Sequence, residues 1–553
     1  MFILKKPARS HALGEPILHA DHPRPVTRRD FVSAGLISGP AVVMAPAWLG
    51  AMLRSGNANA LSTDMQALLA ATQCNVPSAA SGIPFIAFDL AGGANLVGSE
   101  VLVGVNGGQM NFLSTAGYGK QGLPGNMVPT SSAFVSNALG LLWHSDGAIL
   151  RGILSKATTP ATAAGTNGAV IAALSQNDTG NNPHNPMYGI AKAVNKQGNT
   201  PKGKLLTLIG TQSTVSGGNS AAPMTLIDPT LQPTKISQPS DAVGLVDTGG
   251  ATADPVAVAV LESQARISGG SGLYDSTAAG AAAEAAFSGS LTAPAGATPG
   301  VQLLADQVAD AKLKNSVRCA YVKSANTADE FGTPSALDPT KDTNIIGGTT
   351  PIFTAADFKD GDIQKTATVM KLVLGGFAAA GTITLGGYDY HDSTRASGET
   401  RNFKAGQMIG AVLEYAQRMA TPVMIYVFSD GSLSATSSID NSAATATSQG
   451  GRGKLGWQGD NQSTASTFFL VYSPTGRPAL RNGAASQQIG YFSADGSVVS
   501  TSSPAANSVN QLVQTVLLNY MGLLGTDSQF AATFPMQGLG TAAANLVAFQ
   551  PIV

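Results

Sequence analysis

The sequence predicts an α/β protein in which a mostly parallel sheet is covered by helices on both faces. Apolar segments of strand length alternate with segments of helical length, above all in the second half of the chain, and this alternation is typical of parallel sheets. Polar or glycine-rich residues follow several of the strand segments, at the edge where such sheets bind ligands. The chain has 553 residues, of which 43% are hydrophobic and only 12% are charged. It is therefore long enough for one large domain with insertions or for several domain-sized units.

The first half of the chain contains two clear strand candidates. Residues 85–90 form an apolar run that ends in the glycine loop Ala91-Gly92-Gly93-Ala94-Asn95, and residues 204–210 form the second run. Helical segments are also expected at residues 63–73, 132–154 (a helix followed by a strand) and 161–174.

The composition changes in the middle of the chain. Residues 215–300 are rich in Gly, Ala, Ser and Pro, which predicts an insertion or cap. Further helices are expected at residues 253–267, 277–287 and 302–323. The predicted units are a leader (1–60), the N-terminal half of the α/β domain (61–214), the insertion (215–300) and the C-terminal half of the domain (301–553).

Regular alternation of helices and strands resumes at residue 362. The predicted helices cover residues 363–379, 403–419 and 508–524. The predicted strands cover residues 382–385, the apolar part of 422–432, and 466–473. The last of them follows a glycine-rich loop.

The first sixty residues have the features of a signal peptide for export in the folded state. Arg28-Arg29 comes shortly before a weakly apolar run, residues 32–53, and Ala58-Asn59-Ala60 offers a small-x-small cleavage site. Glycines and prolines within the run make it a poor membrane anchor, although an uncleaved signal remains an alternative. We therefore expect the twin-arginine translocase as a partner during export. The mature protein is expected in the periplasm or at the outside of a bacterial cell, with no stable transmembrane segment after cleavage.

Composition and missing motifs exclude several classes of function. No basic cluster interleaved with aromatic residues is present, which argues against nucleic-acid binding. Cys74 and Cys319 could pair in an oxidising compartment but are too few for a cysteine-rich metal site. The chain has no nucleotide, flavin or haem signature, and it lacks the G-x-S-x-G motif of α/β-hydrolases.

Candidate metal-ligating residues follow the predicted strands of the second half. Asp389 and His391 come just after the strand at 382–385, and their side chains can point the same way if the backbone stays extended. An aspartate oxygen and an imidazole nitrogen can bind one divalent cation. Asp430 follows the next strand, and Asp460 lies in the glycine-rich loop before the last one. The alternative for each residue is a polar turn or a helix cap.

Taken in order, these segments resemble domain-of-unknown-function family 1501, whose members are bacterial proteins exported by the twin-arginine route. The family is distantly related to the alkaline phosphatases and sulfatases. The resemblance covers residues 85–524 and is best over 364–433, where Gly387-Tyr388-Asp389-Tyr390-His391 is similar to the family's Gly-Trp-Asp-Thr-His. It implies an alkaline-phosphatase-like fold in which Asp389 and His391 match metal-site residues.

The sequence departs from the family pattern at three signatures. Asn95 stands where the family has an aspartate, and Asn461 replaces the histidine of Gly-Thr-Asp-His-Gly. In the family's Ser-Glu-Phe-Gly-Arg signature, Asp430 stands at the acidic position, but Leu433 replaces the arginine. This replacement removes a side chain that could bind an anion. An amide oxygen can still bind Ca²⁺ or Mg²⁺ but holds Zn²⁺ poorly. His184 matches a family histidine only loosely.

Two functions remain open at this stage. One is an exported protein of phosphatase/sulfatase-like fold with a degraded metal site, acting as a non-catalytic surface or binding protein. The alternative is a hydrolase of phosphate or sulfate esters that depends on a divalent metal (Ca, Mg or Zn). Its metal ligands would be Asp389, His391, Asp430 and Asp460, with Asp89, Asn95, His184 or Asn461 as additional ones. Such a hydrolase requires Asp389, His391 and Asp430 to converge within about 5 Å.

Overall fold

The computed structural model describes residues 81–175, 182–245, 321 and 334–553. All of them belong to the unit Leu61–Val553. The expected leader, the expected helices at 63–73, 253–267 and 277–287, nearly all of the one at 302–323, and both cysteines lie outside the described residues.

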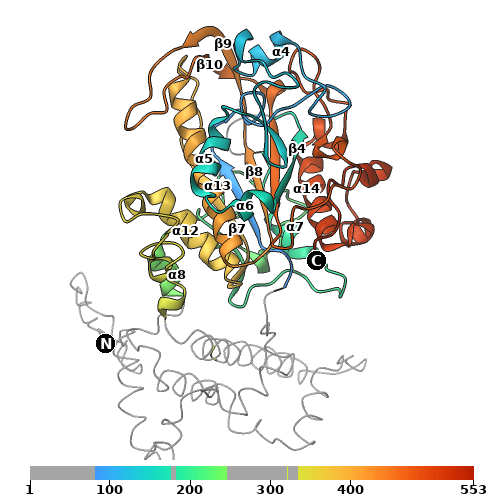
Figure 1. The fold of residues 1–553 in the computed structure, drawn as a ribbon. Coiled ribbons are helices and arrows are strands. Elements are labelled where there is room, and N and C mark those ends of the chain that lie inside the picture. The colour runs from blue at the N-terminus through green and yellow to red at the C-terminus, as the bar shows by residue number, and fades with distance from the viewer. Residues whose placement is uncertain (1–80, 176–181, 246–320, 322–333) are drawn as a thin grey trace, which may run out of the picture. The chain divides into compact units, whose positions relative to one another are not determined.

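An eight-stranded sheet forms the centre of the described chain (Figure 1). In spatial order its strands are β12 (Gln488–Ile489), β4 (Thr166–Ala172), β11 (Ser466–Tyr472), β8 (Val423–Ser429), β1 (Phe85–Leu90), β7 (Ala378–Leu385), β5 (Leu206–Gly210) and β6 (Thr234–Lys235). Every neighbouring pair is parallel except the two pairs that β11 makes, with β8 and with β4. The predicted α/β class with a mostly parallel sheet is confirmed.

The inner strands are apolar along their whole length because both faces of the sheet are covered. Strand β1 is buried at every position, with Ile86, Phe88 and Leu90 in one hydrophobic cluster and Phe85 and Ala87 in the other. This division follows from the two-residue period of a strand.

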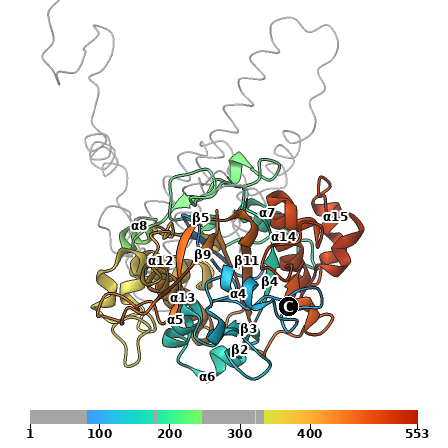
Figure 2. The same cartoon turned by 90° about the horizontal axis from the view of Figure 1, so that it is seen from above.

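Helices cover both faces, as the view along the sheet shows (Figure 2). The first cluster includes residues of α5 (Ala148–Lys156), α12 (Gly361–Leu374) and α13 (Ala396–Arg418). The second includes residues of α7 (Met187–Lys192) and α14 (Val509–Leu524). Shorter helices are α4 (Thr115–Lys120), α6 (Pro160–Ala164), α8 (Pro239–Gly244) and α15 (Phe530–Thr533).

Helix α14 lies where the sequence predicts it, and both of its ends carry recognisable caps. The Ser508 hydroxyl accepts a hydrogen bond from the Gln511 backbone N–H, which satisfies one of the free donors of the first turn. Gly525 ends the helix in the left-handed conformation, with φ of 72°.

Two predictions for the first half of the chain are wrong. Residues 132–154 form a hairpin followed by a helix, because Gly140, with φ of 79°, turns β2 (Val135–Leu139) into β3 (Leu141–His144) ahead of α5. The expected helix at 161–174 is mostly strand β4, since α6 ends at Ala164. Pairing with β11 and full burial override the helical propensity of this alanine-rich stretch.

The second half differs from the prediction mainly at element boundaries. Helix α12 ends at Leu374, before a turn at Gly376 with φ of 76°, so residues 378 and 379 belong to β7. Helix α13 begins at Ala396, earlier than expected. A hairpin of β9 (Leu433–Asp440) and β10 (Lys454–Asp460) occupies the region expected to be a glycine-rich loop.

Helices α5 and α13 touch through their backbones. A Cβ atom on Gly152 would overlap the Phe403 carbonyl, and one on Gly406 would overlap the Ile149 carbonyl. Glycine is therefore required at this crossing, where residues 403–410 of α13 lie directly against α5.

None of the helices in the described ranges combines the length and the apolar character needed to cross a membrane.

We expect Gly406→Ala to lower the free energy of unfolding by roughly 1 to 3 kcal/mol, because the added methyl group overpacks the α5–α13 contact. Gly361→Ala is the matched control, since a Cβ there meets no atom within 4 Å and alanine favours helix formation. Denaturant unfolding of both variants measures the difference, and equal stability of the two would contradict the tight contact.

Candidate metal centre

Three loops meet at the carboxyl edge of the sheet because strand β1 pairs in parallel with both β7 and β8. Leu90, at the end of β1, lies opposite Leu385 in β7 and Ser429 in β8. The glycine loop after β1, the loop with Asp389 after β7 and Asp430 after β8 therefore leave the sheet side by side. This is the usual position of ligand sites in parallel sheets.

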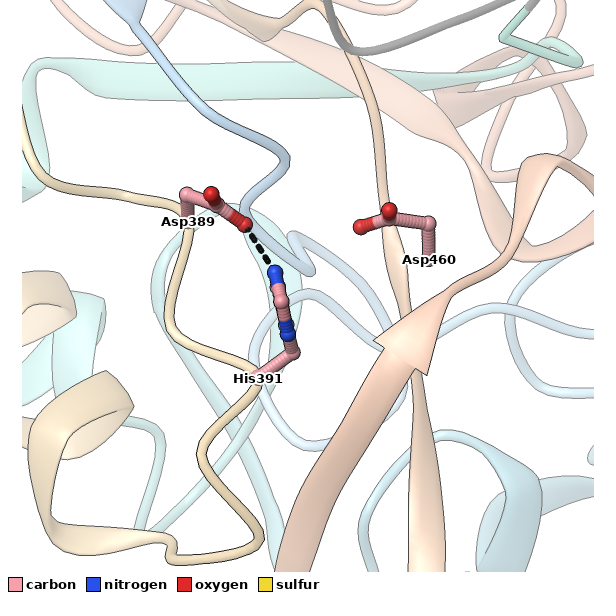
Figure 3. Close-up of side chains that lie close together, drawn as sticks. All are labelled: Asp389, His391 and Asp460. Carbon is pink, nitrogen blue, oxygen red and sulfur yellow. Dashed lines mark ion pairs between the residues drawn. The ribbon is translucent and has the colours of Figure 1, made fainter.

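Asp389, His391 and Asp460 form a cluster in which each residue offers one ligand atom and these atoms lie within 4.8 Å of one another. The Asp389 carboxylate contacts His391 Nε2 at 2.6 Å, and Asp460 faces this pair from the end of β10 (Figure 3). About half of the Asp389 side chain is exposed, as is a similar share of His391 (55% and 43%). Two carboxylates and one imidazole are a suitable ligand set for Zn²⁺, and the open side leaves room for water or an external ligand. We call these three residues the cation cluster.

Asp430 is not one of the three residues of the cation cluster and is almost fully buried. Its Oδ1 accepts a hydrogen bond from the Gly92 backbone N–H at 2.9 Å, and its Oδ2 accepts one from Asn219 Nδ2 at 3.3 Å. A Cβ atom on Gly92 would overlap the Asp389 backbone, so Gly92 packs directly against this segment. The glycine loop therefore contacts the Asp389 segment and also binds the Asp430 carboxylate.

Asp89 is fully buried near Asp430, at the end of β1. It accepts hydrogen bonds from Ser220, at 2.8 Å from the backbone N–H and 3.2 Å from the hydroxyl. Burial raises the pKa of Asp89 to about 7, and the negative charge of Asp430 adds to this shift.

The remaining sequence candidates have local structural partners. Asn95 is buried and bonds to the Leu433 carbonyl and the Val97 N–H. The Asn461 side chain accepts hydrogen bonds from the Ser463 N–H and hydroxyl, which begins a short 3₁₀ turn.

His184 lies inside the protein, stacked on Phe428 with 5.7 Å between ring centroids. Neither of its ring nitrogens has a hydrogen-bond partner in the described structure, and burial lowers its pKa to about 4. The histidine is therefore neutral at physiological pH and does not belong to the cation cluster.

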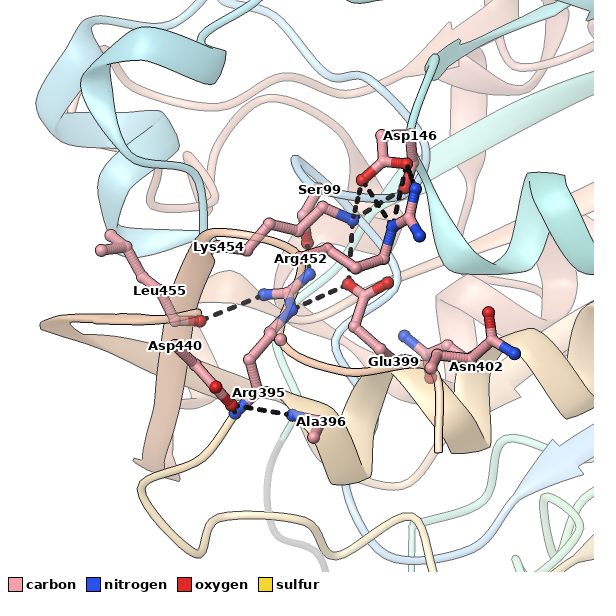
Figure 4. Close-up of polar contacts among 12 residues, drawn as sticks. Ser99, Asp146, Arg395, Ala396, Glu399, Asn402, Asp440, Arg452, Lys454 and Leu455 are labelled. Atoms are coloured by element: carbon pink, nitrogen blue, oxygen red, sulfur yellow. Dashed lines mark hydrogen bonds and ion pairs between the residues drawn. The ribbon is translucent and has the colours of Figure 1, made fainter. Parts of the chain in front are cut away.

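Sequence reasoning missed a buried ionic network beside the cation cluster (Figure 4). Its centre is Glu399, whose carboxylate binds side chains of α13, β10 and α5. The cationic partners are Arg395, Lys454 and Arg151. The spacing of Arg395 and Glu399, four residues apart on a helix, is the only signal that the sequence gives for it.

A second carboxylate, Glu100, lies next to this network. It accepts hydrogen bonds from the Ile149 N–H at the start of α5 and from Asn402 Nδ2. Burial raises the pKa of Glu100 to about 7, and the charge of Glu399 adds to the shift.

Fold and geometry together define an α/β protein with a candidate cation site at the carboxyl edge of its sheet. Comparisons of the chain with protein-family models, with curated proteins and with solved structures found no match.

Gly92→Ala should destabilise the protein more than Gly93→Ala, by roughly 1 to 3 kcal/mol. Both glycines have φ of 137°, so alanine is strained at either position. Only at Gly92 does the new methyl group overlap the Asp389 backbone, whereas at Gly93 it makes ordinary contacts of 3.7 Å or more. Denaturant unfolding of the two variants isolates the overlap, and equal losses would show that the Asp389 loop moves aside freely.

Asp89→Asn should stabilise the cation-free protein above neutral pH. Because the folded-state pKa of about 7 lies above the ordinary aspartate value of 3.8, the unfolded chain ionises first as pH rises. The wild type therefore loses stability from about pH 4 to pH 7, and the loss stays constant above that. Asparagine keeps an oxygen for Ser220 and removes this titration.

Unfolding of both proteins across pH 4–9, with chelator present, measures the effect. The gain of Asp89→Asn over wild type should grow to roughly 1 to 3 kcal/mol at pH 8. The exposed Asp228→Asn serves as the control and should show no such gain. A pH-independent difference for Asp89→Asn would contradict a raised pKa.

Proposed function

We propose that this chain is an exported, non-catalytic binding protein that holds one divalent cation at Asp389, His391 and Asp460. The observation that supports this most directly is the convergence of their ligand atoms within 4.8 Å at an exposed position. In this proposal the scaffold descends from the alkaline phosphatase and sulfatase-like proteins, as the resemblance to domain-of-unknown-function family 1501 implies.

The ligand set suggests that a bound cation would have open coordination positions. Three protein ligands leave at least one coordination position open in a tetrahedral site and more in an octahedral one. An exposed cation with open positions can bind a carboxylate, phosphate or sulfate group of another molecule. The bound cation would thus supply an anion-binding point on the surface.

Support for a non-catalytic role comes from the arrangement around the cluster. Hydrolysis by a two-metal mechanism uses ions about 3.5–4 Å apart, each with its own ligands. Among the described residues the cation cluster is the one group of three or more candidate ligands that meets the distance requirement. The Asp430 carboxylate is bonded to Gly92 and Asn219, and Leu433 stands where the family has an arginine.

The second candidate is a metal-dependent hydrolase of phosphate or sulfate esters, and one observation favours it. Asp89 and Asp430 are buried carboxylates close to the same edge of the sheet, and the pKa of Asp89 is raised to about 7. Groups that titrate near neutral pH are typical of catalytic sites.

Export and location are part of the same proposal. The twin arginine at Arg28-Arg29 and the Ala58-Asn59-Ala60 site support transport by the twin-arginine translocase. The mature protein would then act in the periplasm or at the cell surface, where a folded chain could bind its cation before or after transport.

Mature protein purified without chelator should contain one divalent metal ion per chain, and Asp389→Asn should lose most of it. Elemental analysis and calorimetric titration with Ca²⁺, Mg²⁺ and Zn²⁺ measure content and affinity. We expect the dissociation constant to rise at least tenfold, because the variant removes a charged ligand. Asp228→Asn removes the same charge at an exposed turn, where the Thr230 N–H donates to the side chain, and should leave binding unchanged.

Hydrolysis assays on the same proteins distinguish the two functions. The metal-loaded wild type should not hydrolyse aryl phosphates or aryl sulfates above the rate of the Asp389→Asn variant. Hydrolysis that is lost in both Asp389→Asn and Asp89→Asn would favour the enzyme instead. A metal-free wild type that binds none of the three cations would contradict both functions.

A further inference from the structure

The cation cluster is built from two segments that are distant in the sequence. Asp389 and His391 precede helix α13, whereas Asp460 is the last residue of β10. Two backbone hydrogen bonds join these segments, from the Ser393 N–H to the Trp457 carbonyl at 2.8 Å and from the Trp457 N–H to the Thr394 carbonyl at 2.9 Å. The ligands can converge only while these segments stay together.

We propose that Glu399 is the positioning residue of this site, which holds the segment of Asp389 and His391 against the strand of Asp460. This inference rests on the proposed cation binding and assigns a role to a residue that does not touch the cation.

Glu399 connects both ligand-bearing segments through one buried carboxylate. Its Oε1 accepts hydrogen bonds from Arg395 Nε, at the start of α13, and from Lys454 Nζ, at the start of β10, both at 2.9 Å. Its Oε2 accepts one from Arg151 Nη2 of α5 at 2.7 Å. Figure 4 shows Arg395 and Lys454 approaching this carboxylate from different elements.

The connection reaches the ligands through Arg395 and Trp457. Arg395 lies four residues after His391, and its guanidinium lies over the Trp457 ring, 4.3 Å from the ring centroid. Trp457 also lies near the Tyr390 ring, with 6.3 Å between the centroids. Tyr390 is the residue between Asp389 and His391, so these ring contacts link both sides of the site.

A second carboxylate supports the same junction from the hairpin. Asp440, at the end of β9, accepts hydrogen bonds from the backbone N–H groups of Arg395 and Ala396 at 2.8 and 3.2 Å. It thereby caps the N-terminus of α13, a position that favours negative charge. The β9–β10 hairpin and α13 are therefore joined at the helix start as well as at Glu399.

The charge of Glu399 is what keeps the junction closed. Lys454 and Arg395 are almost completely buried, and their attraction, led by that of Lys454, lowers the pKa of Glu399 despite its burial. With glutamine at this position, Arg395 and Lys454 would lose the carboxylate that bridges them, although Asp146, which binds Lys454 and Arg452, and Glu100 remain nearby. Unpaired buried charges are strongly unfavourable, so β10 and the start of α13 should separate.

A matched residue on the same helix distinguishes positioning from general stability. Glu414 is also a fully buried carboxylate of α13. It binds the hydroxyls of Thr159 and Thr162 and pairs with Arg418, close to the other end of the helix. Glu399→Gln and Glu414→Gln should both lower stability, but only the first should affect the cation cluster.

The first readout is cation affinity, measured calorimetrically with Ca²⁺, Mg²⁺ and Zn²⁺ on the mature protein. Glu399→Gln should raise the dissociation constant of the tightest-bound of these ions at least tenfold, whereas Glu414→Gln should change it less than twofold. Affinity that is unchanged in Glu399→Gln would overturn the inference while leaving the proposed cation binding intact.

The second readout does not require a cation. Hydrogen exchange followed by mass spectrometry, in chelator, should show faster exchange of segments 389–394 and 454–460 in Glu399→Gln than in Glu414→Gln. Equal exchange in the two variants would overturn the positioning role. If the wild type binds no cation, the proposed function fails, yet exchange still decides whether Glu399 holds the two segments together.

Discussion

The candidate site depends on the two parallel hydrogen-bond ladders that strand β1 makes with β7 and β8. These ladders fix the register, so that Leu90 lies opposite both Leu385 and Ser429. A slip of one residue would move every side chain of β1 to the other face of the sheet, and Asp89 would then leave the polar environment of Ser220. Full burial of the strand on both faces makes such a slip costly. The fixed register places the loops after these strands side by side.

Two buried carboxylates of this protein illustrate how surroundings decide ionisation. Glu399 is surrounded by three cationic side chains, and the pKa of Glu399 is lowered although the residue is buried. Asp89 is bound by donors of Ser220 and lies near another acid, so burial dominates and its pKa rises to about 7. Burying ion pairs contributes little net stability, because desolvation offsets most of the attraction. The Glu399 network is therefore better understood as fixing geometry than as strengthening the fold.

Long apolar segments made most of the sheet predictable. Strands β1, β8 and β11 and helix α14 are clear in the sequence because their apolar runs are continuous or regularly spaced. The hairpin of β9 and β10 lacks an apolar pattern, because β9 is mostly Ser, Thr and Ala and is half-exposed or exposed over most of its length, and β10 carries only two large apolar residues, Leu455 and Trp457. The sequence of strand β4 predicts a helix, because its partner strand β11 is some 300 residues away in the chain and local propensity does not register this pairing.

The site was predictable only in part, for a related reason. Asp389 and His391 are two residues apart, and their proximity follows from the local sequence, whereas the approach of Asp460 requires the unrecognised hairpin. Asp430 resembles the other candidates because it also follows a strand. Its carboxylate is held by the Gly92 N–H, a backbone donor that carries no side-chain signal, and by Asn219, which is distant in the sequence. The Glu399 network involves elements that only the folded chain brings together.

The edges of the described sheet also bear on strand pairing with other chains. Both outermost strands, β6 and β12, are only two residues long and therefore offer few unpaired backbone groups. Long, flat edge strands recruit other chains and lead to aggregation, and short ones remove that template. Within the described chain, the sheet therefore presents little template for edge-to-edge pairing with another strand.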